Sequence, residues 1–167
     1  MEEIKVNLDN LTNEERETLL KLVEKGNKTN KKRWRSKRNN KYYSISNCGD
    51  LISNIEYGCG LDESSYQLGN YFKTEKEAEF ARDKQLIYQK LKDYALEHNT
   101  EEIDWNNLNQ FKWFIRYDSN YKEIKYCWTR FSIYINQIYF TSKEIVKDAI
   151  KEIGEDNIKK YLFGGNE

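Results

Sequence analysis

The chain has 167 residues and a mass of 20.2 kDa, a size that suits one compact domain or two very small ones. Its 28 Lys and Arg balance 28 Asp and Glu, which excludes a general electrostatic attraction to nucleic acid or to an anionic membrane. No apolar run approaches the roughly 18 residues of a membrane helix, and the acidic beginning "MEEIKVNLDN" lacks the features of a signal peptide. We therefore expect a cytoplasmic protein.

The first predicted element is an N-terminal helix within residues 1–27. Thr12 and Glu15 have the spacing of a capping box, leucines follow at helical intervals, and Gly26 marks the end. Residues 28–41 then hold eight Lys or Arg and no acidic residue. Because asparagines are interspersed among these cations, we interpret residues 28–40 as a basic lead-in and not as a regular element.

Residues 41–99 predict a β-β-β-α unit. The segments "KYYSIS" and "LISNIEY" flank the turn signal "NCGD" and predict a hairpin, and "YQLGNYF" predicts a third strand. The longest predicted helix follows, with Thr74 as its N-cap and apolar residues at helical spacing.

The same order recurs over residues 100–167. "FKWFIRYD" and "IKYCWTR" predict a second hairpin, "FSIYINQIYF" a further strand, and "TSKEIVKDAIKEIG" a helix capped by Ser142, with a short helical segment at the end. The segments 70–81 and 138–149 match at an offset of 68, which suggests duplication. We predict an α+β fold with antiparallel hairpins, in one compact domain overall, because tight turns cannot join parallel strands.

Three phrases carry a resemblance to a known family: "GNYFKTEKEAEFA", "DWNNLNQFKWFIRYD" and "AIKEIGEDNIKKYLF". Over residues 12–164 the chain resembles an uncharacterised family of small proteins encoded by phages and prophages of low-GC Gram-positive bacteria. Members approach the first strand through a Trp and a Gly-Glu type of turn, whereas this chain has Asn39, Asn40 and Lys41 there. The resemblance implies that the protein acts in the cytoplasm of a bacterial host.

The sequence shows no catalytic constellation and no metal-ligand spacing. Cys48, Cys59 and Cys127 are far apart and His98 is the sole histidine, so we expect free thiols, no metal and no cofactor. His98 ends the long predicted helix, where a cation complements the helix dipole. We predict that the chain is not an enzyme.

Two groups of side chains are candidates for binding. The first would contact an anion or nucleic acid, unless the lead-in is only a solvated connection to the first strand; its members are Lys32, Arg33, Trp34, Arg35, Lys37, Arg38 and Lys41. The second would form an aromatic and cationic sheet face that stacks bases or fills an interface, unless it is ordinary cross-strand packing; its members are Tyr42, Lys112, Phe114, Arg116, Tyr126, Trp128 and Arg130.

Residue chemistry and the family resemblance together favour a non-catalytic accessory protein that binds and blocks a host antiviral defence component. Its target would be an RNA-guided nuclease, as for an anti-CRISPR protein, or a nucleotide immune signal that it sequesters. The alternatives are a phage nucleic-acid-binding or regulatory protein and a structural or assembly partner. The expected partner is thus a defence protein or its nucleic-acid or nucleotide component, and a homo-oligomer is compatible with the sequence.

Overall fold

The computed structural model describes residues 11–27 and 33–164. Internal contacts divide the chain into two compact units, Met1–Arg35 and Ser36–Glu167. Helix α1 (Asn13–Asn27) belongs to the first unit. The Glu15 N–H donates to the Thr12 hydroxyl at 3.3 Å, and the Thr12 N–H donates to Glu15 Oε2 at 2.9 Å, so the predicted capping box is confirmed.

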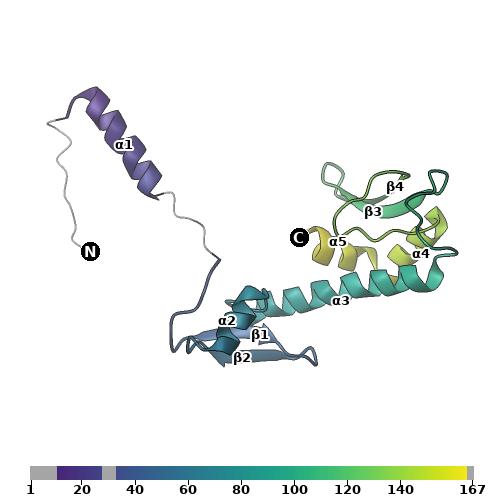
Figure 1. Ribbon diagram of the computed structural model, residues 1–167, viewed down its shortest axis with the longest axis horizontal. Coiled ribbons are helices and arrows are strands. Elements are labelled where there is room, and N and C mark those ends of the chain that lie inside the picture. Colours follow the sequence, from purple (N-terminus) through teal and green to yellow (C-terminus); the bar gives the residue numbers. More distant parts are fainter. Residues whose placement is uncertain (1–10, 28–32, 165–167) are drawn as a thin grey trace. The chain divides into compact units, whose positions relative to one another are not determined.

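The second unit contains the remaining elements, which Figure 1 labels. They are β1 (Lys41–Ile45), β2 (Leu51–Ile55), α2 (Gly60–Gln67), α3 (Glu75–His98), β3 (Lys112–Asp118), β4 (Glu123–Thr129), α4 (Lys143–Ile153) and α5 (Glu155–Phe163). β1 pairs with β2 and β3 with β4, both antiparallel, which confirms the α+β class with its two hairpins and long helix α3. No helix in the described ranges is long and apolar enough to cross a membrane.

The prediction of a third strand in each half is wrong. In the first half the region of the expected strand begins inside helix α2, and only Phe72 pairs, in a single antiparallel bridge with Tyr43. In the second half only Phe140 pairs, in a bridge with Trp113. In the first half, helix α2 begins where Asp62 accepts the N–H groups of Tyr57 and Cys59, and it takes the first two residues of the expected strand. In the second half, side-chain hydrogen bonds hold the segment after β4 as a loop.

Both predicted N-caps are confirmed. The Thr74 hydroxyl accepts the Glu77 N–H at the start of α3, and the Ser142 hydroxyl accepts the Ile145 N–H at the start of α4, each at 3.2 Å. In each half the cap lies two residues beyond the single bridge, at Phe72 and Phe140. In each half a short bridge segment therefore leads straight into a capped helix.

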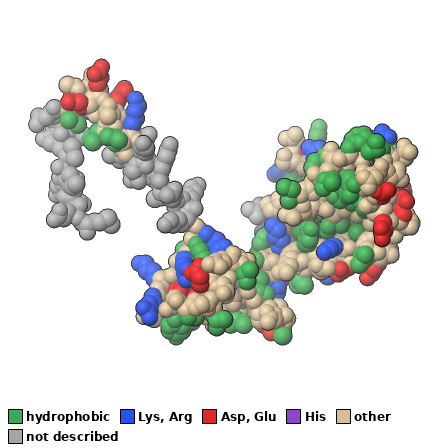
Figure 2. Space-filling model, in the orientation of Figure 1, with side chains coloured by type: hydrophobic (Ala, Val, Ile, Leu, Met, Phe, Trp, Pro, Cys, Tyr) green, Lys and Arg blue, Asp and Glu red, His purple; other side chains and the backbone are tan. Residues whose placement is uncertain are grey.

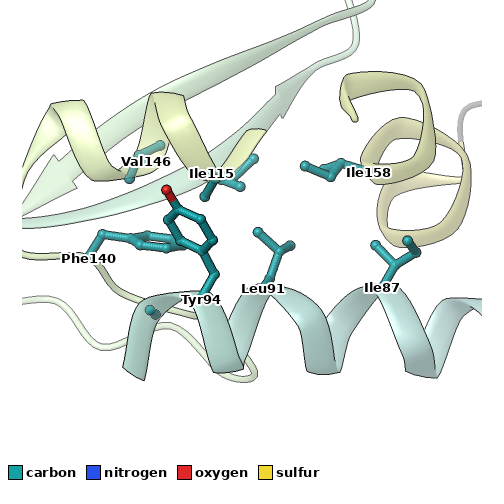
Figure 3. Close-up of a cluster of buried hydrophobic side chains, with 9 residues drawn as sticks. Ile87, Leu91, Tyr94, Ile115, Phe140, Val146 and Ile158 are labelled. Atoms are coloured by element: carbon teal, nitrogen blue, oxygen red, sulfur yellow. The ribbon is translucent and has the colours of Figure 1, made fainter. Parts of the chain in front are cut away.

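The main core lies where α3 meets the second hairpin, α4 and α5 (Figure 3). Ile87, Leu91 and Tyr94 point from α3 toward Ile115 of β3 and toward residues of the two C-terminal helices. Phe140, Val146, Ala149 and Ile158 have no exposed surface. The bridge at Phe140 thus places that ring in the centre of the core, beside the strand to which it is bonded.

Candidate interaction surface

The basic lead-in is only partly within the described ranges. Lys32 lies outside them, so the prediction for Lys32 is not addressed. Arg33 and Trp34 are exposed and Arg35 is half-buried, and all three have interactions inside the protein. They belong to the first unit, whereas Lys37, Arg38 and Lys41 belong to the second.

Lys37, Arg38 and Lys41 are exposed on one turn that leads into β1. The Asn40 N–H donates to the Lys37 carbonyl at 3.0 Å, and Asn39 has a φ of 67°, a conformation that asparagine tolerates better than most residues. The Asn39 N–H donates to the Glu56 carbonyl at 2.7 Å, which ties the turn to the residue after β2. The turn therefore exposes these three predicted cations within five residues of chain.

The predicted aromatic and cationic face is not one face. Ile115 pairs with Tyr126 and Trp113 with Trp128 in the β3–β4 register, and directly paired residues share a face of the sheet. Tyr126 and Trp128 therefore lie on the face of the core residue Ile115. Lys112, Phe114 and Arg116 lie on the opposite face, because alternation along β3 separates them from Ile115. The alternation in each strand was read correctly, but the register between the strands was not.

Two members of the predicted face on β3 are buried. Lys112 has no exposed surface, and its ammonium donates to the carbonyl oxygens of Asn107 at 2.8 Å and Gln110 at 3.2 Å. Phe114 is 8% exposed and packs against Tyr134 and Tyr139. Lys112 thus anchors the loop before β3, and of the three β3 candidates only Arg116 is exposed.

Tyr42 is buried too, and it belongs to a polar network that the sequence reasoning missed. Its hydroxyl donates to Asp62 Oδ1 at 2.9 Å, and its ring stacks on Tyr71 with 3.9 Å between the ring centres. The Tyr71 hydroxyl donates to Glu56 Oε2 at 2.6 Å. Asp62 and Glu56 are each 3% exposed. A Cys-x-x-Asp spacing at the start of α2 was the available signal, since Asp62 receives the Cys59 N–H at 3.1 Å.

The network shifts the pKa values of its members. Burial raises the pKa of Tyr42 to about 12, and its hydrogen bond to the Asp62 carboxylate acts in the same direction. Burial also raises the pKa of Asp62, but hydrogen bonds from the Tyr57 N–H, the Tyr42 hydroxyl and the Cys59 N–H outweigh it, and the pKa falls to about 2. The network therefore holds β1 and α2 together and does not form an open site.

A cluster of exposed rings surrounds Arg130, just after β4. The guanidinium carbon lies 5.2 Å from the centre of the Phe111 ring, 5.8 Å from that of Trp128 and 5.7 Å from that of Phe131. Phe111 and Trp128 meet edge to face at 4.8 Å. Such cation–π contacts hold a guanidinium in place. The buried Nε of Arg130 nevertheless has no hydrogen-bond partner among the described residues.

Apolar side chains continue from this cluster along the loop after β4. Phe131, Ile133 and Ile135 are 68%, 67% and 93% exposed. Figure 2 shows hydrophobic side chains gathered on the surface of the part of the molecule that contains β3 and β4. We call Phe111, Trp128, Arg130, Phe131, Ile133 and Ile135 the aromatic surface.

Hydrogen bonds fix the loop that carries the aromatic surface. The Thr129 hydroxyl accepts the N–H groups of Phe131 at 3.3 Å and Ser132 at 2.9 Å. The Tyr139 hydroxyl accepts the Tyr134 N–H at 2.7 Å and donates to the Ser132 carbonyl at 3.5 Å. The exposed apolar side chains are therefore held on an ordered scaffold, which lowers the entropy cost of binding a partner.

No match was found when the chain was compared with protein-family models, with curated proteins and with solved structures. The family resemblance of the sequence therefore stays a prediction. Within residues 11–27 and 33–164, no three His, Cys, Asp or Glu side chains lie close enough to hold a metal ion. Cys48, Cys59 and Cys127 form no disulfide in this structure.

Proposed function

We propose that the chain is a non-catalytic accessory protein that binds and blocks a host antiviral defence component through its aromatic surface. One observation carries the proposal: Phe131, Ile133 and Ile135 are largely exposed on a loop held by hydrogen bonds. Large apolar side chains that gather on a surface favour an interaction site, because their exposure to water is costly.

The chemistry of this surface favours a protein partner over a nucleotide. Arg130 and Trp128 are residue types that dominate the binding energy of protein interfaces, and apolar residues extend the contact beside them. Lys112, which the sequence placed on the same face, is buried on two backbone carbonyls and is unable to reach a phosphate.

The resemblance to phage and prophage proteins directs the choice of partner. Among defence components we favour a protein of an RNA-guided nuclease, which the chain would inhibit in the manner of an anti-CRISPR protein. A sponge for a nucleotide immune signal is the weaker version, because the aromatic surface has one guanidinium, enclosed by rings, in place of several convergent cations.

Direct nucleic-acid binding is a second candidate, and the turn before β1 favours it. Lys37, Arg38 and Lys41 are exposed there within five residues of chain. Three such cations would neutralise a few phosphates and give weak, salt-sensitive binding without sequence preference. We place this contact second because the whole chain has no net charge to strengthen it.

A plaque assay tests the proposed function. The chain is expressed in a bacterium whose RNA-guided nuclease restricts a phage, and plaques are counted against a strain without the nuclease. We expect the chain to restore plating, and the triple variant Phe131→Ser, Ile133→Ser, Ile135→Ser to lose this effect while its circular dichroism stays unchanged. Equal restriction with and without the wild-type chain would contradict inhibition of that nuclease.

We further infer that the two halves of the second unit descend from one β-β-β-α ancestor whose third strand has shortened to a bridge. The inference is supported by the equal spacing from bridge to cap, Phe72 to Thr74 and Phe140 to Ser142. In both halves the bridge also forms on the first strand of the hairpin.

A further inference from the structure

A pocket of about 570 Å³ opens between α3, α5 and the segment that leads into Phe140. It lies within the second unit, and its lining shares no residue with the aromatic surface. Its volume lies within the range of about 300–1,000 Å³ that is usual for pockets that bind small molecules.

The floor of the pocket is the core itself. Leu91, Ile115 and Phe140 line it, and in all three at most 4% of the surface is exposed. Ile138 and the C-terminal residues Leu162 and Phe163 of α5 form apolar walls. Water in such a pocket finds few hydrogen-bond partners, so an apolar group that displaces it gains free energy.

The rim of the pocket is polar and positively charged. Lys84 and Gln85 from α3 and Asn136 from the opposite segment are exposed there. Lys84 is the one charged residue of the lining. No carboxylate in the described residues forms a salt bridge with Lys84. The adjacent Asp83 is bonded to Arg82 at 2.9 Å and to the Tyr161 hydroxyl at 3.0 Å.

A neighbouring hollow, which shares Tyr88, Gln137 and Ile138 with the first pocket, has a different chemistry. Its volume is about 480 Å³, and it is lined by Lys92 together with Asp93. Lys92 and Asp93 carry opposite charges, which cancel. Among the residues that line this hollow, Ala95 is the one that belongs to the buried core cluster. Of these two hollows in the described part of the chain, the first combines an apolar floor with an unbalanced cation at its mouth.

We propose that this pocket binds a small amphiphile, with an aromatic or aliphatic body on the apolar floor and one anionic group beside Lys84. The body makes contact with Leu91, Ile115 and Phe140, and Lys84 supplies the charge complement, with the amides of Gln85 and Asn136 as hydrogen-bond donors. A sugar or a dinucleotide fits poorly, since its hydroxyl groups would face the apolar floor without partners.

The probe for the test is 8-anilinonaphthalene-1-sulfonate, which joins an aromatic body to one sulfonate. We expect saturable binding of one equivalent to the folded full chain, seen as enhanced fluorescence. Nuclear magnetic resonance of the labelled chain should show shifts of the amides of residues 136–138 and 162–163. Shifts confined to residues 128–135 would place the probe on the aromatic surface and overturn the proposal.

Three variants separate the floor from the rim. Ala81→Trp fills the pocket from α3 and should abolish the one-to-one binding, because Ala81 lines it. Lys84→Gln should lower the affinity for the sulfonate probe about threefold to fivefold, the size expected for loss of an exposed ion pair. The matched control Lys92→Gln, on the same helix but in the neighbouring hollow, should leave the affinity unchanged.

An uncharged probe with the same kind of body, N-phenyl-1-naphthylamine, completes the design. The affinity of the chain for this uncharged probe should fall with Ala81→Trp and stay unchanged with Lys84→Gln. If both probes respond equally to Lys84→Gln, or if neither responds to Ala81→Trp in a variant whose circular dichroism is that of the wild type, the proposal is wrong. Should Ala81→Trp fail to fold, Ala81→Leu applies the same test with a smaller reduction in volume.

Discussion

The hydroxyl of Tyr42 donates a 2.9 Å hydrogen bond to Oδ1 of Asp62, and both side chains are 3% exposed. Asp62 Oδ2 also accepts the Tyr57 N–H at 2.9 Å and the Cys59 N–H at 3.1 Å. A buried carboxylate is stable only when its oxygens are satisfied in this way. The pair connects β1 to the start of α2, a helix whose last two residues, 66–67, are the first two of the predicted strand.

Acid should weaken this connection. Because the pKa of Asp62 falls from 3.8 to about 2 in the folded protein, the carboxylate stabilises the fold at pH above 4, and this stability is lost as pH falls toward 2. Asp62→Asn should lower the free energy of unfolding at pH 7 by about 2 kcal/mol, as for loss of hydrogen bonds to a charged group. Urea unfolding at several pH values measures both.

The control for this prediction is the difference between the wild type and Asp62→Asn. Other carboxylates also titrate in acid, but they do so in both proteins. We expect the difference in free energy of unfolding to shrink as pH falls from 4 to 2. A difference that stays constant over this range would show that Asp62 is not the titrating group.

Lys112 should matter for stability and not for binding. Lys112→Met removes the ammonium that bonds the carbonyls of Asn107 and Gln110, and leaves both acceptors without that donor. We expect a loss of about 1–3 kcal/mol in the free energy of unfolding, measured with urea. The exposed Arg116, four residues further along β3 and on the same face, is the matched site: Arg116→Gln should change stability by less than about 0.5 kcal/mol. Equal effects of the two variants would be inconsistent with a buried Lys112.

The basic turn before β1 should account for any contact with nucleic acid. The triple variant Lys37→Ser, Arg38→Ser, Lys41→Ser removes three exposed cations, so it should unfold like the wild type to within about 0.5 kcal/mol. We expect the wild type to bind a fluorescent oligonucleotide weakly at low salt and the variant to bind none. Fluorescence anisotropy measures this, and binding that persists in the variant would locate the contact elsewhere.

Local signals of the sequence were read correctly, and relations between distant segments were not. Thr12, Thr74 and Ser142 cap helices as predicted, because a cap depends on residues three positions away. Trp128 was assigned to the wrong face, since alternation gives the two faces of a strand but not its register with a partner. The burial of Lys112 depends on a loop that wraps over it, which no local pattern reveals.

The aromatic surface likewise was predicted only in part from the sequence. Trp128 and Arg130 were named from the sequence, and the guanidinium carbon of Arg130 lies 5.8 Å from the centre of the Trp128 ring. Phe131, Ile133 and Ile135 were predicted to lie in a strand, so their exposure was missed. Side-chain bonds from Thr129 and Tyr139 hold this segment as a loop and overcome its strand propensity.

The measurement that tests the central claim most directly is quantitative capture of partners from lysate of the infected host. The wild type is compared with Phe131→Ser, Ile133→Ser, Ile135→Ser and with a control that changes exposed apolar residues elsewhere, Leu61→Ser, Leu68→Ser. Mass spectrometry identifies proteins and small molecules in each eluate. We predict that a protein of an RNA-guided nuclease is enriched by the wild type and by the control, and is lost with the triple variant. Equal enrichment by all three proteins, or enrichment of no defence component, would contradict the claim.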